Sequence, residues 1–186
     1  MSNLRVASRY AKSILELSLE KGLLDEVYAD FKKLNTIAQE NREFGLLLKN
    51  PIVSSDKKLK VLQALFAKDS PELTVKFFEI VARKNRADVL VEVAKEFIAQ
   101  YNLHKSIQVA ELTTTYPVEE SQRAEFEKLV KDISGKKTIQ FIEKINPDLI
   151  GGFVLKVNDR LLDESLKSKL NALKIEFSQN HYESKI

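Results

Sequence analysis

The chain has 186 residues, of which 44% are hydrophobic and 31% are charged, a balance typical of folded proteins rather than disordered ones. Its 30 basic and 27 acidic residues leave a formal net charge of +3, which argues against a strongly basic nucleic-acid-binding protein. The sequence contains no cysteine, which excludes disulfides, a thiolate nucleophile and a cysteine-bound zinc ion. With only two histidines, far apart in the sequence, we expect no metal site and no cofactor.

No apolar run approaches the roughly 20 residues that a membrane-spanning helix needs. The first six residues enter a helical pattern at once, without the basic start, apolar run and cleavage site of a signal peptide. The sequence therefore predicts neither a membrane-spanning helix nor a signal peptide.

Residues 1–85 contain few glycines and prolines, and their apolar side chains recur at helical spacing. The same spacing continues to Tyr101. The sequence therefore predicts six short helices, whose apolar stripes or bounds are Ala7–Leu17, Leu24–Ala38, Glu43–Lys49, Leu59–Phe66, Leu73–Val81 and Val89–Tyr101. Short amphipathic helices with brief links are typical of a helical bundle.

Three boundaries in this half carry recognisable end signals. Ser55 or Asp56 is expected to cap the fourth helix, because serine and aspartate accept hydrogen bonds from the first free N–H groups. Ser70 and Pro71 predict an N-cap followed by proline at the first helical position of the fifth helix. His104 ends the sixth helix, where a positive charge suits the negative end of the helix dipole.

The pattern changes after Lys105, where strand-forming residues begin to alternate with helical segments. We expect a strand around Ile107–Thr115, a helix at Glu119–Ser134, strands around Ile139–Ile145, Gly152–Val157 and Arg160–Asp163, and a final helix carrying Leu166–Phe177. The predicted fold class is mainly α with a small α/β part. Its predicted organisation is a six-helix bundle at 1–104, a small mixed α/β domain at 105–178 and a polar, fraying tail at 179–186.

A search for catalytic or ligand-binding motifs favours structural roles throughout. Gly151 and Gly152 lack the surroundings of a phosphate-binding loop and indicate close backbone packing or a bulge. Asp159, at a turn, does not fit the spacing of a calcium loop. Asp163 or Ser165 is expected to cap the last helix.

Two segments resemble one protein family more specifically than any of these motifs. The first is VASRYAKSIL at 6–15, and the second is NPDLIGGFVLKVNDRLLDESLKSKL at 146–170. With Asn50-Pro51 and the stretch Arg83–Arg86, they resemble the delta subunits of bacterial F-type ATP synthases, counterparts of the mitochondrial oligomycin-sensitivity-conferring subunit. Asn158 and Glu164 stand where family members often have glycine, which puts the hairpin turns in doubt because glycine accepts a positive φ.

The resemblance implies a non-catalytic stator subunit of the peripheral stalk, present in one copy per complex. Such a subunit links the alpha subunits of the catalytic head to the b subunit and resists rotor torque during proton-driven ATP synthesis. It implies a location on the cytoplasmic face of the bacterial inner membrane, within the complex. In the family the first and fifth helices grip an N-terminal helix of alpha. The matching positions here are Tyr10, Ala11, Ile14, Phe77, Ile80 and Val81, and Gly151, Gly152 and Asp159 are expected to shape turns.

Other classes of function stay open at this point. Nucleic-acid binding would use the basic residues of the second half, Lys136, Lys137, Lys156, Arg160, Lys167 and Lys169, although no aromatic residues are interleaved among them for base stacking. An enzyme would need convergent polar groups in a pocket, and no sequence motif points to one.

Overall fold

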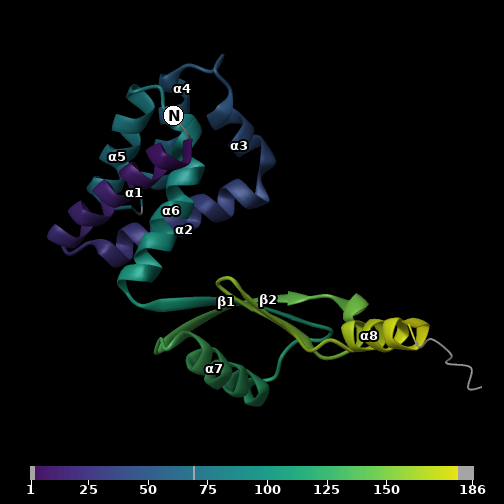
Figure 1. Ribbon diagram of the computed structural model, residues 1–186. Coiled ribbons are helices and arrows are strands. Elements are labelled where there is room, and N and C mark those ends of the chain that lie inside the picture. The colour runs from purple at the N-terminus through teal and green to yellow at the C-terminus, as the bar shows by residue number, and fades with distance from the viewer. Residues whose placement is uncertain (1–2, 69, 180–186) are drawn as a thin grey trace, which may run out of the picture. The chain divides into compact units, whose positions relative to one another are not determined.

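The computed structural model describes residues 3–68 and 70–179, and the predicted tail beyond them lies outside the described residues (Figure 1). The protein is mainly helical with a small mixed four-stranded sheet, as the sequence predicts at that level. The chain forms two compact units, Met1–His104 and Lys105–Ile186. Among the described residues, no helix combines the length and apolar character required to cross a bilayer.

Helices account for the first unit. They are α1 (Asn3–Glu20), α2 (Leu24–Glu40), α3 (Arg42–Lys49), α4 (Ser55–Phe66), α5 (Glu72–Arg83), a 3-10 turn η1 (Ala87–Val89) and α6 (Leu90–His104). Helix α6 packs mainly against α1 and α2, and α4 packs against α5. The apolar stripes that predict the helices therefore also form the core between them.

Aromatic rings fill the centre of this core. The Phe31 ring of α2 stacks on Phe97 of α6, with centroids 4.5 Å apart, and meets Phe78 of α5 edge-on at 5.8 Å. All three side chains are almost completely buried. Because rings in such pairs gain about 0.5–1.5 kcal/mol beyond their burial, they fix the spacing of three helices at once.

The predicted helix caps at Ser55 and Ser70 are wrong. The N-cap of α4 is Ser54, and the Ser55 hydroxyl donates instead to the Asn85 side chain at 2.8 Å. The N-cap of α5 is Pro71, because the Ser70 hydroxyl donates to the buried carboxylate of Asp30 at 2.6 Å. In both cases a tertiary hydrogen bond replaces the local one that the sequence suggests.

The second unit is built on a sheet with strand order β2-β1-β3-β4. Its elements are β1 (Ile107–Thr114), α7 (Glu120–Ser134), β2 (Thr138–Ile145), a 3-10 turn η2 (Pro147–Leu149), β3 (Phe153–Val157), β4 (Arg160–Asp163) and α8 (Leu166–Gln179). Strand β1 pairs parallel with β2 and antiparallel with β3. The parallel pair requires a crossover connection, which α7 supplies.

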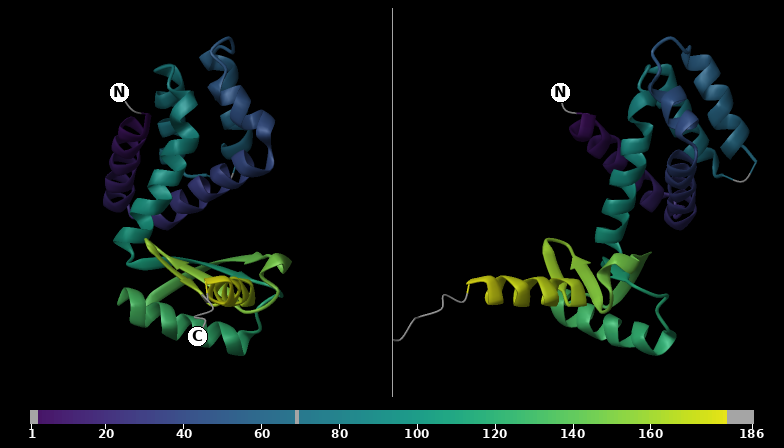
Figure 2. Two further views of the ribbon diagram at one scale, coloured as in Figure 1. Left: turned by 45° about the vertical axis from the view of Figure 1, so that its right-hand side comes forward. Right: turned by 90° about the vertical axis from the view of Figure 1, so that its right-hand side faces the viewer.

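Helix α7 covers one face of this sheet (Figure 1). Its buried Val130 packs on Ala110, Leu112 and Leu155 of the central strands. Helix α7 starts with a capping box between Glu119 and Gln122 and ends at Gly135 in the left-handed region, as the sequence predicts for the glycine. Helix α8 follows the sheet, has its main contact with η2 and projects beyond the strands (Figure 2).

Candidate functional site

Helix α1 carries two apolar stripes, and only one of them faces the core. Ala7, Ala11 and Ile14 are buried beneath the helix. The small alanine side chains allow α6 to approach closely. The second stripe consists of Val6, Tyr10 and Leu17, one and then two helical turns apart, and these side chains are half-buried or exposed. An apolar arc this wide leaves one edge of α1 available to another molecule.

Helix α5 supplies the facing wall. Its Phe77 is half-buried, and its ring meets Tyr10 edge-on with centroids 6.2 Å apart. One turn further along, Ile80 leaves 52% of its surface exposed. We call Val6, Tyr10, Phe77 and Ile80 the α1–α5 seam.

The seam is held rigidly from below. Phe77 also meets the buried Phe31 edge-on at 5.9 Å, so that a continuous row of rings runs from Tyr10 to the centre of the unit. Rings held by such contacts have few rotamers left to lose. Docking on the seam therefore costs little side-chain entropy.

A hollow of about 360 Å³ opens beside the seam. It is lined by Val6, Arg9, Tyr10, Ser13 and Arg86. Apolar and cationic groups thus share one concave surface, which suits an amphipathic segment better than a purely apolar or purely ionic ligand.

The six residues predicted to bind a partner helix occupy three different environments. Ile80 is exposed, and Tyr10 and Phe77 are half-buried. Ala11, Ile14 and Val81 are at most 2% exposed, because the unit's own core covers them. In this structure these three support the seam from beneath, and their direct contact with a partner stays a prediction.

Sequence reasoning missed the two arginines of the hollow. The available signal was the stretch Arg83–Arg86 after α5. Its Asn85 has a φ of 55°, and the Arg86 and Asn85 amides donate to the carbonyls of Val81 and Ala82 at 3.0 and 2.9 Å. This pair of hydrogen bonds is a Schellman motif, in which asparagine is an accepted substitute for glycine.

In the second unit the glycine pair lies where two backbone segments approach closely. Gly152 has a φ of 76°, and a Cβ there would lie 2.2 Å from the carbonyl oxygen of Glu164. A Cβ on Gly151 would lie 2.7 Å from the Leu166 side chain. Asp159 is exposed in the β3–β4 turn, where the positive φ of 53° belongs to Asn158. Glu164 has no positive φ, so a side chain is tolerated there.

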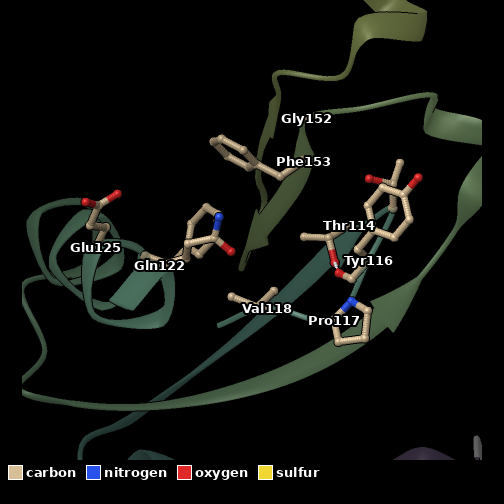
Figure 3. Close-up of a pocket in the computed structure, with 10 residues that line it drawn as sticks. Thr114, Tyr116, Pro117, Val118, Gln122, Glu125, Gly152 and Phe153 are labelled. Atoms are coloured by element: carbon tan, nitrogen blue, oxygen red, sulfur yellow. Dashed lines mark hydrogen bonds between the residues drawn. The ribbon is translucent and has the colours of Figure 1, made fainter. Parts of the chain in front are cut away.

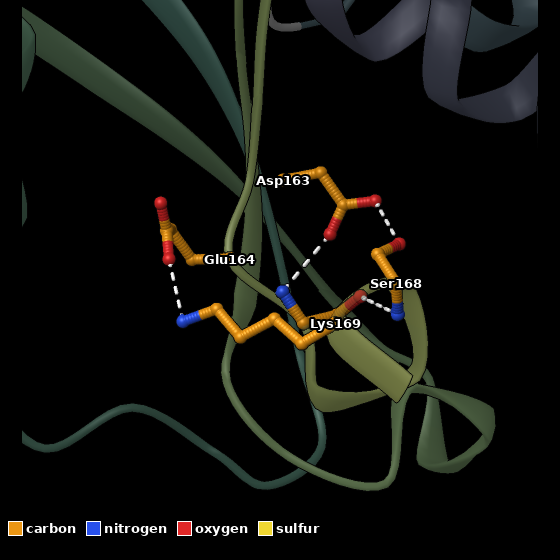
Figure 4. Close-up of polar contacts among 5 residues, drawn as sticks. Asp163, Glu164, Ser168 and Lys169 are labelled. Carbon is orange, nitrogen blue, oxygen red and sulfur yellow. Dashed lines mark hydrogen bonds and ion pairs between the residues drawn. The ribbon is translucent and has the colours of Figure 1, made fainter. Parts of the chain in front are cut away.

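The start of α8 is capped by two side chains, as the sequence predicts (Figure 4). The Ser165 hydroxyl accepts from the Ser168 amide at 3.2 Å, and the Asp163 carboxylate accepts from the Ser165 amide at 2.9 Å. Asp163 also accepts from the Ser168 hydroxyl at 2.6 Å. These hydrogen bonds, first that of the Ser168 hydroxyl, hold the pKa of Asp163 below its usual range. The cluster is a helix cap and not a catalytic group.

Helix α8 exposes most of its apolar side chains. Leu166, Leu170, Leu173 and Phe177 recur at helical spacing, and each is at least 47% exposed. A helix that is this apolar on a solvent-facing stripe is typical of an element that packs on a partner. The second unit therefore offers an interaction surface of its own.

Another hollow lies at the end of β1, between α7 and β3 (Figure 3). Thr114, Tyr116, Gln122, Phe126 and Phe153 are among its walls, and Glu125 is its single carboxylate. Acid–base catalysis by paired carboxylates has no basis there. Among the described residues, no group of three metal-ligating side chains occurs either.

The basic residues of the second unit do not point to nucleic-acid binding. Lys169 pairs with Glu164 at 2.7 Å. Lys156 is opposite Glu111 in the β1–β3 register. Lys136 donates to a backbone carbonyl at 3.5 Å. Lys169 and Lys136 are thus engaged within the unit itself, which reduces the number of cations available for phosphate contacts.

Comparison with known proteins agrees with this geometry. The family model described as ATP synthase delta (OSCP) subunit matches residues 6–177. The ATP synthase subunit delta of Cytophaga hutchinsonii is 39% identical over 179 residues, covering 96% of this chain and 97% of that protein. The subunit of the same name from Amoebophilus asiaticus is 33% identical, covering 97% and 98%.

A solved structure, the Toxoplasma gondii mitochondrial ATP synthase hexamer, contains a chain with a TM-score of 0.70 to this one at 23% identity. The match covers 92% of this chain and 97% of that chain, and it shows a shared fold. The family match and the relatives that align over nearly the whole chain lead to one assignment. The chain belongs to the ATP synthase delta (OSCP) subunit family.

Proposed function

We propose that the protein is the non-catalytic stator subunit of an F-type ATP synthase. It joins the alpha subunits of the catalytic head to the b subunit and keeps the head from turning with the rotor during proton-driven ATP synthesis. One copy serves each complex, at the cytoplasmic face of the bacterial inner membrane. It reaches that membrane through the other subunits.

The observation that carries this proposal is the α1–α5 seam. Helix-in-groove recognition uses apolar anchors one helical turn apart, and Val6, Tyr10, Phe77 and Ile80 offer them on two walls. In the proposed complex the six helices of the first unit act as one bundle, and an N-terminal helix of the alpha subunit lies on the seam.

The second unit supplies the attachment to the b subunit. The exposed leucines of α8 and its Phe177 present an apolar stripe to which the end of a long b helix can pack. Burial of each such side chain stabilises the contact by about 1.5–3 kcal/mol when complete.

Neither surface alone suffices for a stator. A nanomolar complex requires about −12 kcal/mol. Four partly exposed seam anchors give at most about 2 kcal/mol each, or about 8 kcal/mol before the costs of association. Attachment through both units raises the effective concentration of the second contact and thereby supplies the difference.

A pull-down tests the proposal. The tagged full chain, incubated with detergent-solubilised membranes of cells that make it, should recover the alpha and b subunits in similar amounts. A variant with Leu170 and Phe177 of α8 both changed to Asp should lose b while retaining alpha. Recovery of neither subunit by the unaltered chain would refute the stator function.

A further inference from the structure

Among the described residues, the two arginines beside the seam have no acidic partner. Arg9 and Arg86 line the hollow with Val6 and Tyr10, and both are exposed. Neither forms an ion pair with the other described residues, although Arg83, three residues before Arg86, pairs with Glu79 at 2.5 Å. Two like charges that share one concavity repel each other until an anion binds between them.

Arg86 is placed there by the backbone. The Schellman motif at Val81–Arg86 turns the chain sharply after α5, and the Ser55 hydroxyl holds the Asn85 side chain at 2.8 Å. The motif therefore fixes the origin of the Arg86 side chain next to α1.

The start of α1 carries basic but no acidic side chains. Its first turn contains no acidic residue, as in α8, whereas each of the helices α2 to α7 has at least one. Arg5 and Arg9 are one turn apart on the helix, and the first carboxylate is Glu16. Positive charge near the positive end of the helix dipole is unfavourable in the isolated unit. A carboxylate bound near this end of α1 would relieve that unfavourable charge.

We propose that Arg9 and Arg86 form an anion clamp that selects and orients the docked helix through a carboxylate on it. The inference rests on the proposed function, because it concerns the chemistry of the helix that fills the seam. The partner is an amphipathic helix with an Asp or Glu one turn away from an apolar anchor. Arg9, Arg86 and Tyr10 line the same hollow, so a carboxylate and an apolar anchor on one helix can reach both kinds of group.

A polypeptide fits this surface better than a nucleic acid does. The arginines line the hollow together with apolar Val6, which has nothing to gain from a phosphate backbone. The Tyr10 ring is already engaged edge-on by Phe77, so it is not a free platform for base stacking. An acidic amphipathic helix satisfies both kinds of group at once.

The test is a double-mutant cycle in the full chain. The probe is a synthetic peptide of the alpha subunit's N-terminal helical segment, in its native form and with its Asp and Glu residues changed to Asn and Gln. Affinities are measured by fluorescence anisotropy for the unaltered chain, for Arg9→Gln, for Arg86→Gln and for the double variant. Arg42→Gln, at an exposed position of α3, is the matched control.

Each single substitution should weaken binding of the native peptide about two- to fivefold, and the double variant about tenfold, as expected of rim ion pairs. The neutral peptide should bind all variants equally. Added salt should weaken only the binding of the native peptide to the unaltered chain. Arg42→Gln should change nothing. Equal affinity of the unaltered chain and the double variant for the native peptide would overturn the clamp and leave the seam intact.

Failure of the native peptide to bind the unaltered chain would overturn the proposed function together with the clamp. A single-stranded oligonucleotide, included as a competitor, tests whether the two arginines bind the phosphate groups of a nucleic acid instead of a carboxylate. The inference would be contradicted if the oligonucleotide bound the unaltered chain or displaced the peptide from it, and if the double variant no longer bound the oligonucleotide. That result would show a phosphate site.

Discussion

At Gly152 the close approach of two backbone segments makes a sharp prediction. Gly152→Ala forces a Cβ to 2.2 Å from the Glu164 carbonyl oxygen and also penalises a φ of 76°. We expect it to destabilise the second unit by more than about 2 kcal/mol.

Gly135→Ala is the matched control for this substitution. Gly135 has a φ of 68°, but a Cβ there meets nothing within 4 Å. It should therefore cost only the conformational penalty of about 1–2 kcal/mol. Urea denaturation followed by circular dichroism compares the two. Equal losses of unfolding free energy would show that the contact at Glu164 does not matter.

Tyr101 should make the first unit less stable as the pH rises into the alkaline range. Burial, and then its hydrogen bond to Asp25 at 2.7 Å, raise the pKa of Tyr101 to about 12. Between the ordinary tyrosine pKa of about 10 and this value, the unfolded chain releases a proton that the folded chain keeps. The stabilisation is fully present below pH 10 and is lost as pH rises through 12.

We therefore expect the unaltered protein to lose stability more steeply than Tyr101→Phe between pH 9 and 11. Tyr116→Phe, at a residue that is 77% exposed, should follow the unaltered protein. Urea denaturation at several pH values measures the slopes. Parallel slopes for the unaltered protein and Tyr101→Phe would rule out this role of Tyr101.

Among the elements, α8 depends most on its cap, because its contacts with the rest of its unit are few. Ser165 is 1% exposed and accepts from the Ser168 amide. Ser165→Ala should cost about 1 kcal/mol. Hydrogen exchange of the first-turn amides of α8 should accelerate about fivefold, while exchange in α7 stays unchanged. Unaltered exchange in α8 would mean that the cap does not hold the helix.

Most elements can be predicted from the sequence, because apolar spacing and glycine or proline boundaries are local signals. The stripes from Ala7 to Tyr101 each correspond to a helix, and Gly135 ends α7 as expected. The caps at Ser55 and Ser70 could not be predicted, since Asn85 and Asp30 compete for those hydroxyls from distant segments. The parallel register of β1 and β2 is likewise set by long-range packing under α7.

The candidate site was predictable only in part, for a related reason. Helical spacing places Tyr10, Ile14, Phe77 and Val81 on the apolar faces of two helices. It does not show which of these side chains pack in the core and which remain at the surface. Packing against α6 and the unit's core buries Ile14 and Val81 and leaves Ile80 exposed. The left-handed backbone of Asn85 sets the position of Arg86 in the site, and the spacing of apolar residues gives no sign of this conformation.

At the level of the whole molecule, the function requires both units on one chain. Cleavage near Lys105, at the boundary of the two units, should leave each half able to bind its own partner weakly. Assembly of the head onto the stalk should nevertheless fall by about 100-fold or more, because the effective concentration supplied by the link is lost. Reconstitution of ATP synthase depleted of this subunit measures the effect. Equal assembly by the separated halves would contradict it.

The central claim is that the α1–α5 seam binds a helix of the alpha subunit. Its most direct test is the affinity of the alpha N-terminal peptide for the full chain and for Ile80→Asp, with Ile52→Asp, at a 90% exposed isoleucine after α3, as control. Loss of an apolar contact and desolvation of a carboxylate should weaken binding at least about tenfold in Ile80→Asp. The control should bind like the unaltered chain. Undiminished binding by Ile80→Asp would contradict the account.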